Sequence, residues 1–335
     1  MKYNSIIDRA YRKLRFDYNR ALVEKEAEMA ALSAKRDAAT ASLARQVDVL
    51  RNLVFAMQRT VRECISSHPK EGDFVTCDVC GAKSEFRFVG RIMGKYDIRY
   101  YQCPECGLMQ TEKPYWLQEA YDSPLSSSDT GLVWRNERMR DVVKAVVGVF
   151  FEGKAAICEY ACGYGLLTRM LRDAGLECRA YDKYSRPIFA RGFEDDGARR
   201  YDLVTVFEAL EHFETPIDEL RRIFDRAGSV IFSEELLSDP VLSPGEWWYY
   251  CAEHGQHIHF YSLKTLEFIA TIFGKRLYFH DKIGLLTDKE IDPGRFADCI
   301  DRCQQHAEAL SLPPLTVSDM NFIIDRGCDG DRNGA

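Results

Sequence analysis

The stretch Ile157-Cys158-Glu159-Tyr160-Ala161-Cys162-Gly163-Tyr164-Gly165 runs from apolar residues through a carboxylate to two glycines, and a helical pattern follows it. Glycine at a strand-to-helix turn lets the backbone approach a ligand where a Cβ atom would intrude. A dinucleotide-binding turn would carry a third glycine at position 168, where this chain has Thr168. The stretch therefore predicts an α/β domain with a ligand site at the turn, and it argues against a pyrophosphate ligand.

Two later stretches continue this pattern. Asp182 ends the next apolar run, 23 residues after Glu159, where a carboxylate can accept hydrogen bonds from both ribose hydroxyls. Residues 201–212, YDLVTVFEALEH, then place acids and a histidine after a third apolar run. Together the three stretches resemble class I S-adenosylmethionine-dependent methyltransferases, whose cofactor carries a cationic sulfonium that suits Glu159.

The resemblance implies a Rossmann-like methyltransferase domain over 151–326 with a mostly parallel, seven-stranded sheet. We expect strands near 155–159, 178–182, 202–207 and 229–233, with 275–280 and 321–325 as the last two. A loop is expected from 115 to 129 and a helix over 135–150. The linker and lead-in segment is expected over 116–150. The expected cofactor-binding residues are Glu159, Tyr160, Ala161, Gly163, Gly165, Asp182, Phe207 and Glu208.

A second informative region, the expected substrate-binding insertion over 240–262, contains the run Trp247-Trp248-Tyr249-Tyr250 and the histidines His254, His257 and His259. Aromatic faces hold sugar rings, and imidazole transfers protons near neutral pH. The region resembles a segment of sugar methyltransferases that carry a four-cysteine zinc module, in which a Glu-His pair serves carbon methylation. Here the pair is Gln256-His257, so the resemblance implies His257 as general base and favours oxygen methylation.

Other residues near these histidines have candidate roles. Glu253 is suited to orient a histidine or to hold a substrate hydroxyl, and His254 is a further catalytic candidate. His212 is expected near the methyl donor, with a helix-capping or core imidazole as the alternative. A structural hydrogen-bond cluster or a second metal site is the alternative for the histidines of 254–259. Cys299, Cys303 and His306, in an expected helical stretch over 294–310, are half-buried helix residues or a minor metal cluster.

Four cysteines predict a separate metal module over 72–115. Cys77-Asp78-Val79-Cys80-Gly81 and Cys103-Pro104-Glu105-Cys106-Gly107 are two C-x2-C knuckles separated by 22 residues. Four thiolates close a tetrahedral zinc shell and leave no position for water, so we expect a structural Zn²⁺. The intervening stretches 86–89 and 98–101 alternate enough to form the two strands of a ribbon.

The first 68 residues have a helix-forming composition, and no proline or glycine occurs before about residue 66. From Leu43 onward, apolar residues recur in steps of four and three, which is a heptad pattern. We expect a coiled coil over 1–68 that makes the protein a homo-oligomer. The alternative is a single long helix lying on the enzyme's own surface. Residues 327–335 are expected to form a flexible tail.

Composition limits the class of partner. The chain has 335 residues, 46% of them hydrophobic, and a formal net charge of −7. The sequence predicts no membrane span and no signal peptide, and its twelve cysteines suggest thiols and metal ligation, so we expect a cytoplasmic protein. The negative charge argues against a nucleic-acid partner.

The leading functional prediction is methylation of a nucleotide-linked sugar or a glycan. A zinc-ribbon RNA methyltransferase is the first alternative, and a non-catalytic scaffold that keeps the fold is the second.

Overall fold

The computed structural model describes residues 74–121 and 130–325, together with Gln46. The coiled coil predicted over 1–68, apart from Gln46, and the tail predicted over 327–335 lie outside the described residues. The same is true of residues 122–129 in the predicted loop. The account below concerns the compact unit that begins at Glu71.

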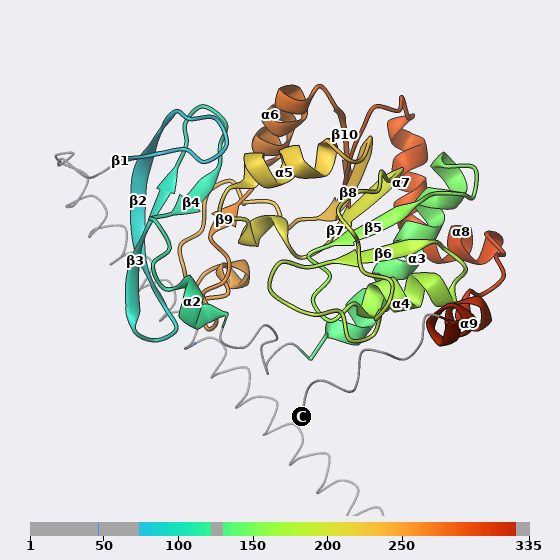
Figure 1. The fold of residues 1–335 in the computed structure, drawn as a ribbon. Helices are drawn as coiled ribbons and strands as arrows, with labels where there is room; N and C mark the ends of the chain where they lie inside the picture. The colour runs from blue at the N-terminus through green and yellow to red at the C-terminus, as the bar shows by residue number, and fades with distance from the viewer. Residues whose placement is uncertain (1–45, 47–73, 122–129, 326–335) are drawn as a thin grey trace, which may run out of the picture. The chain divides into compact units, whose positions relative to one another are not determined.

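The central sheet forms where the sequence predicts parallel strands. Strands β5 (Ile157–Tyr160), β6 (Cys178–Tyr181), β7 (Leu203–Val206) and β8 (Ser229–Ser233) pair in parallel in the order β6-β5-β7-β8 (Figure 1). Strand β11 (Ile283–Thr287) pairs antiparallel with β8, and β10 (Arg276–His280) pairs antiparallel with β11. Strands β7, β8 and β11 are buried along their whole length, because helices cover both faces of the sheet.

Two helical layers enclose this sheet. Helices α3 (Leu132–Phe150), α4 (Leu166–Asp173) and α7 (Pro293–Asp301) share one apolar core with strands β5 and β8. Helix α8 (Cys303–Ala309) packs on α3. The stretch predicted as one helix over 294–310 is therefore two helices, α7 and α8, with Arg302 between them. Helices α5 (Pro216–Phe224) and α6 (Leu263–Phe273) lie in the core on the other face (Figure 1).

A second sheet joins the cysteine module to the methyltransferase-like part of the chain. Strands β1 (Phe74–Thr76), β2 (Lys83–Ile92), β3 (Tyr96–Gln102) and β4 (Met109–Thr111) form an antiparallel meander. The short helix α2 (Leu117–Ala120) follows it. Strand β9 (His259–Phe260), from the histidine-rich segment, pairs with β4 and completes a five-stranded sheet (Figure 1). The predicted ribbon strands are confirmed.

Two predictions about the central sheet are wrong. Within the described residues the sheet has six strands rather than seven; its pairing is parallel across β6-β5-β7-β8 and antiparallel where β11 pairs with β8 and β10. Beside β6, a single parallel bridge joins Ala180 to Glu194. The residues around Glu194 include Gly192, Asp196 and Gly197, which disfavour extended pairing.

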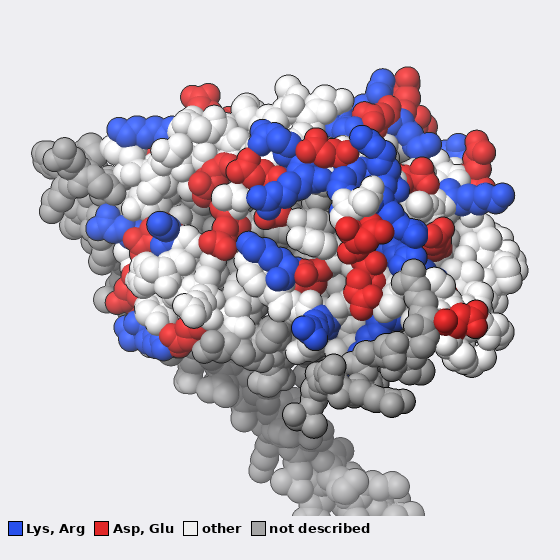
Figure 2. Space-filling view, in the orientation of Figure 1, with Lys and Arg blue, Asp and Glu red and all other residues white. Residues whose placement is uncertain are grey.

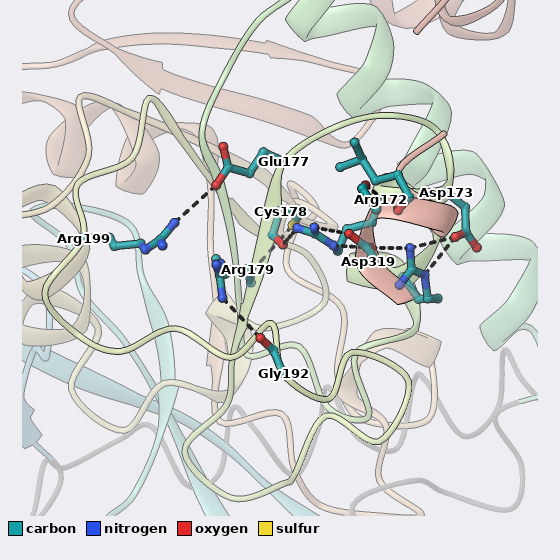
Figure 3. A network of polar contacts seen from close by, with 11 residues as sticks. Arg172, Asp173, Glu177, Cys178, Arg179, Gly192, Arg199 and Asp319 are labelled. Atoms are coloured by element: carbon teal, nitrogen blue, oxygen red, sulfur yellow. Dashed lines mark hydrogen bonds and ion pairs between the residues drawn. The ribbon is translucent and has the colours of Figure 1, made fainter. Parts of the chain in front are cut away.

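The second error concerns residues 321–325, predicted as the last strand. They end helix α9 (Thr316–Asp325), and the strand in question is β11. A short apolar run does not by itself distinguish a strand from a helix. Helix α9 is held by Asp319, which is buried and accepts from Arg172 of α4 at 2.5 and 2.8 Å and from Arg169 at 2.8 Å (Figure 3). In the described part of the chain, no helix is long and apolar enough to cross a membrane.

Candidate active site and metal centre

The glycine turn lies at the carboxyl end of β5 and begins α4. Gly163 and Gly165 have φ angles of 54° and 77°, in the left-handed region that favours glycine. A Cβ atom at Gly165 would lie 2.8 Å from the Cβ of Pro187, whereas one at Gly163 would meet no atom within 4 Å. The backbone at Gly163 therefore borders open space, as a ligand turn requires.

Glu159, on β5, binds the first turn of α4 through Thr168. Its side chain is buried, and its Oε2 atom accepts hydrogen bonds from the backbone N–H of Thr168, at 2.7 Å, and from the Thr168 hydroxyl. Burial raises the pKa of Glu159 to about 7. Thr168 thus occupies the place of a third glycine and connects the first turn of α4 to β5.

Asp182, at the carboxyl end of β6, joins the glycine turn to the loop after that strand. Its Oδ2 accepts from the N–H of Gly163 at 2.8 Å, and its Oδ1 accepts from the N–H groups of Tyr184 and Ser185 at 2.8 and 2.6 Å. Oδ2 keeps one acceptor position for a ribose hydroxyl. Of the other predicted cofactor residues, Ala161 has a φ of 60°, and the ring of Tyr160 lies 4.7 Å from that of Tyr181.

Beyond β7 the chain turns sharply, which places Phe207 and Glu208 at the same edge of the sheet. Glu208 has a φ of 50°, and its N–H donates to the Ser233 hydroxyl at 2.8 Å. That hydroxyl donates in turn to Glu208 Oε1 at 2.8 Å, and the Arg135 guanidinium lies 3.9 Å from Oε2. Glu208 thus keeps a half-exposed carboxylate beside the strand ends.

Two predicted histidines meet at a carboxyl group that the sequence reasoning did not assign. His212, at the end of the short helix η1 (Leu210–His212), and His257 have ring centroids 4.8 Å apart. The Nε2 atoms of His212 and His257 lie 3.8 and 3.9 Å from Oε1 of Glu211. We name Glu211, His212 and His257 the imidazole–carboxyl cluster.

Burial sets the charge of this cluster. It lowers the pKa of His212 to about 4 and that of His257 well below its usual value, so both rings are unprotonated at neutral pH. Burial and the nearby charge of Glu208 raise the pKa of Glu211 to about 8. Glu234, also fully buried, has a pKa raised by burial and then by Glu211. Two acids and two neutral imidazoles therefore share one small space.

The remaining residues of the histidine-rich segment have separate positions. The His254 ring centroid lies 5.4 Å from that of His257, so His254 borders the cluster. Glu253 is exposed, and Gln256 is buried with its amide donating to the Ala120 carbonyl at 2.7 Å. Gln256 therefore anchors the end of α2, which explains a glutamine at this position.

The four predicted cysteines come together. Cys77 and Cys106 have Sγ atoms 3.5 Å apart, Cys80 and Cys103 have theirs 3.4 Å apart, and all four lie within 4.8 Å of one another. In a tetrahedral site with Zn–S bonds of about 2.3 Å, neighbouring sulfurs lie about 3.8 Å apart, so the four thiols fit a structural Zn²⁺. Cys299, Cys303 and His306 do not form such a group among the described residues.

The cysteine knuckles contact the histidine-rich segment directly. Asp78, inside the first knuckle, accepts from Gln110 and from Nε2 of His259, both at 3.0 Å. The hydroxyl of Thr265, at the start of α6, donates to the Cys106 carbonyl at 2.9 Å. His259 thus connects β9 to the first knuckle and lies apart from the imidazole–carboxyl cluster.

Three residues of the candidate site are not among those predicted from the sequence: Glu211, Glu234 and Tyr121. Glu211 stands beside the predicted His212, so adjacency was the available signal. The hydroxyl of Tyr121 lies 3.1 Å from Nδ1 of His212, a contact across 91 residues that no local pattern reveals.

Comparisons with known proteins show what the middle of the chain is similar to. Residues 133–275 match the family model described as a methyltransferase domain. Among solved structures, an O-methyltransferase family protein from Burkholderia thailandensis is similar, with 15% identity and a TM-score of 0.38 over 52% of this chain and 68% of that one. The magnesium protoporphyrin IX methyltransferase of Synechocystis PCC 6803 has 15% identity and a TM-score of 0.35 over 51% of this chain and 90% of that one. Human N-acetylserotonin methyltransferase has 14% identity and a TM-score of 0.35 over 52% of this chain and 66% of that one.

No curated protein matches the sequence significantly. The solved structures are too distant to indicate what this chain methylates. The family match covers the glycine turn, Asp182, and the imidazole–carboxyl cluster. Residues 133–275 therefore resemble a methyltransferase domain, which supports a methyltransferase activity for this chain.

Proposed function

We propose that this protein transfers the methyl group of S-adenosylmethionine to a hydroxyl oxygen of a sugar, in a nucleotide-linked sugar or a glycan. The observation that carries the proposal is the position of the imidazole–carboxyl cluster, which follows β7 directly at the strand ends where the glycine turn and Asp182 also lie. Ligands of open α/β sheets bind at this edge.

The residues of the glycine turn suit the cofactor. Open space beside Gly163 accommodates an adenosine compound, and Asp182 retains an acceptor position for its ribose. S-adenosylmethionine supplies an activated methyl group on a cationic sulfonium. The carboxylates of Asp182 and Glu208, at neighbouring strand ends, favour a cation at this edge.

Three exposed aromatic side chains support a sugar as the acceptor. Trp248 precedes Tyr249, whose carbonyl binds His257, and Tyr184 stacks on Tyr121, whose hydroxyl contacts His212. Trp134 precedes Arg135 in the sequence, and the Arg135 guanidinium lies 3.9 Å from Glu208. Trp248, Tyr184 and Trp134 are 68%, 60% and 66% exposed. Flat apolar faces near a proton acceptor suit a sugar ring with its hydroxyl at the cluster.

Three imidazoles, those of His212, His254 and His257, are available to accept the hydroxyl proton. The oxygen then forms the new bond to carbon, and the carbon–sulfur bond breaks with its electron pair left on sulfur. The protein supplies alignment and a proton acceptor. His257 as the general base remains a prediction.

The surface charge favours this substrate class over RNA. On the face seen in Figure 2, Lys and Arg side chains are interspersed with Asp and Glu, so the described residues there form no basic footprint of the kind that nucleic-acid binders show. We further propose that a structural Zn²⁺ fills the four-cysteine site. The heptad pattern before residue 68 leads us to propose self-association.

The test is methyl transfer to a panel of nucleotide sugars, with a mass gain of one methylene group as the readout. His257→Ala should leave cofactor affinity unchanged and lower turnover by roughly 10²-fold or more. His280→Ala, which removes an imidazole on β10, is the control. Wild-type turnover in His257→Ala would exclude His257 from the reaction, and no cofactor binding by the wild type would overturn the proposal.

A further inference from the structure

The imidazole–carboxyl cluster has the composition of a metal site. Glu211, His212 and His257 each offer one ligand atom, and these atoms lie within 4.8 Å of one another. The exposed fractions of the Glu211 and His257 side chains are 0% and 8%. Two imidazole nitrogens and one carboxylate oxygen converge on one point from η1 and from the segment before β9.

Both imidazoles are oriented by a second hydrogen bond. Nδ1 of His257 lies 2.8 Å from the Tyr249 carbonyl, which can only accept, so Nδ1 carries the proton and Nε2 has a free lone pair. Nδ1 of His212 lies 3.1 Å from the Tyr121 hydroxyl, which can donate or accept, so this contact positions the ring without fixing its tautomer. Metal-binding histidines are held in this way, with the second nitrogen bonded to a carbonyl or another oxygen.

The Glu211 carboxyl is the independent observation. Neither of its oxygens has a hydrogen-bond partner within the described residues, although both are buried. If ionised, the group is a buried charge with the Tyr249 hydroxyl beside it, outside good hydrogen-bond geometry, and with the Glu208 and Glu234 carboxyls nearby. If protonated, its O–H finds the nearest imidazole nitrogens at 3.8 and 3.9 Å, beyond hydrogen-bond length. Either state is costly in a native protein, and a bound cation removes the cost.

We infer that Glu211, His212 and His257 bind a divalent first-row transition-metal ion. Two nitrogen ligands favour zinc, copper, iron or nickel over magnesium, calcium and manganese, which prefer oxygen ligands. Ligand atoms at about 2.1 Å from a tetrahedral centre lie about 3.4 Å apart, so each Nε2–Oε1 separation closes by roughly 0.5 Å on binding. Three protein ligands leave at least one position for an oxygen of the acceptor.

This inference rests on the proposed function and deepens it, because it names how the acceptor hydroxyl is activated. A hydroxyl bound to the ion loses its proton more readily. With both Nε2 atoms engaged as ligands, His257 holds the ion instead of acting as the base, and the neighbouring His254 imidazole accepts that proton. The deprotonated oxygen then attacks the methyl carbon as the carbon–sulfur bond breaks.

The experiment is calorimetric titration of the full-length protein with Zn²⁺, after zinc analysis has established that the four-cysteine site is filled. The wild type should bind one further Zn²⁺ per chain. Glu211→Gln and His212→Gln should lose this binding, and Tyr121→Phe, which removes only the partner of His212, should weaken it by roughly 10- to 100-fold. His280→Gln is the control, and thermal unfolding of each variant verifies the fold.

Cys251→Ser separates this site from its neighbour, since Cys251, His254 and His257 also lie within 4.8 Å of one another. Unchanged zinc affinity in Cys251→Ser supports the Glu211 site, and lost affinity overturns it. A wild type that transfers methyl groups but binds no further zinc also overturns the metal site while the proposed function stands. If the wild type binds the ion but methylates no acceptor, the metal-site inference stands and the proposed function is refuted.

Discussion

Replacement of Gly163 by alanine should separate cofactor binding from stability. Gly163 and Gly165 both have positive φ angles, so a Cβ atom at either costs about 1–2 kcal/mol in backbone strain. At Gly163 the new Cβ meets no protein atom within 4 Å. At Gly165 it would lie 2.8 Å from Pro187 and 3.1 Å from Ala190, and such overpacking adds about 1–3 kcal/mol.

Gly163→Ala should therefore lower the free energy of unfolding by only about 1–2 kcal/mol, whereas Gly165→Ala should lower it by about 2–5 kcal/mol. If the space beside Gly163 holds the cofactor, the same methyl group intrudes on it. A comparable overpacking cost of about 1–3 kcal/mol would weaken cofactor binding by roughly 5- to 150-fold.

Urea unfolding and calorimetry with S-adenosylhomocysteine measure the two effects. Gly197→Ala is the matched control, because Gly197 has a φ of 76° and open space around its Cβ position but lies in an exposed loop between β6 and β7. It should show the strain without the loss of affinity. Wild-type affinity in Gly163→Ala would refute the placement of the cofactor at this turn.

Three further predictions concern stability. Asp319→Ala leaves the buried Arg172 guanidinium without its carboxylate and should lower the free energy of unfolding in urea by about 3–5 kcal/mol. The control, Asp298→Ala, removes an exposed ion pair and should lower it by at most about 1 kcal/mol. Equal losses in the two variants would contradict the argument from burial. Because burial raises the pKa of Glu159 from 4.5 to about 7, the native state binds more protons than the unfolded state between these values, so the stability from this group is lost as pH rises from about 4.5 to 7. Glu159→Gln should flatten that part of the urea-midpoint profile, and an unchanged slope would argue against the raised pKa. Cys106→Ser should lose one zinc ion per chain by elemental analysis and lower the melting temperature, and a zinc-free protein that melts like the wild type would contradict a structural ion.

The sequence was sufficient where short-range pattern determines structure. The strands that flank the glycine turn, the ribbon strands between the knuckles and the helix before β5 all carry local signals in apolar periodicity or turn residues. Residues 321–325 carry no such signal, because their helix is fixed by Asp319 pairing with Arg172, 147 residues earlier. A tertiary contact therefore decided what local propensity left open.

The site was predictable in part for the same reason. Histidines at 212 and 257 are conspicuous in the sequence, and their residue type alone suggested proton transfer. Glu211 reads as an ordinary helix residue until the fold brings the His257 ring to its carboxyl group. That approach depends on a hydrogen bond from the N–H of Ile258 to the Glu211 carbonyl, at 3.0 Å, which joins segments 47 residues apart.

The backbone of Ile258 explains why a cysteine module and a methyltransferase domain form one compact unit. Its N–H binds the Glu211 carbonyl on η1, and its own carbonyl accepts from the N–H of Thr111 on β4 at 3.0 Å. The peptide next to His257 is thus held on one side by η1, which follows β7 of the central sheet, and on the other side by β4 of the five-stranded sheet. Because β4 follows the second knuckle directly, an ion in the four-cysteine site would also determine where the His257 ring lies relative to Glu211.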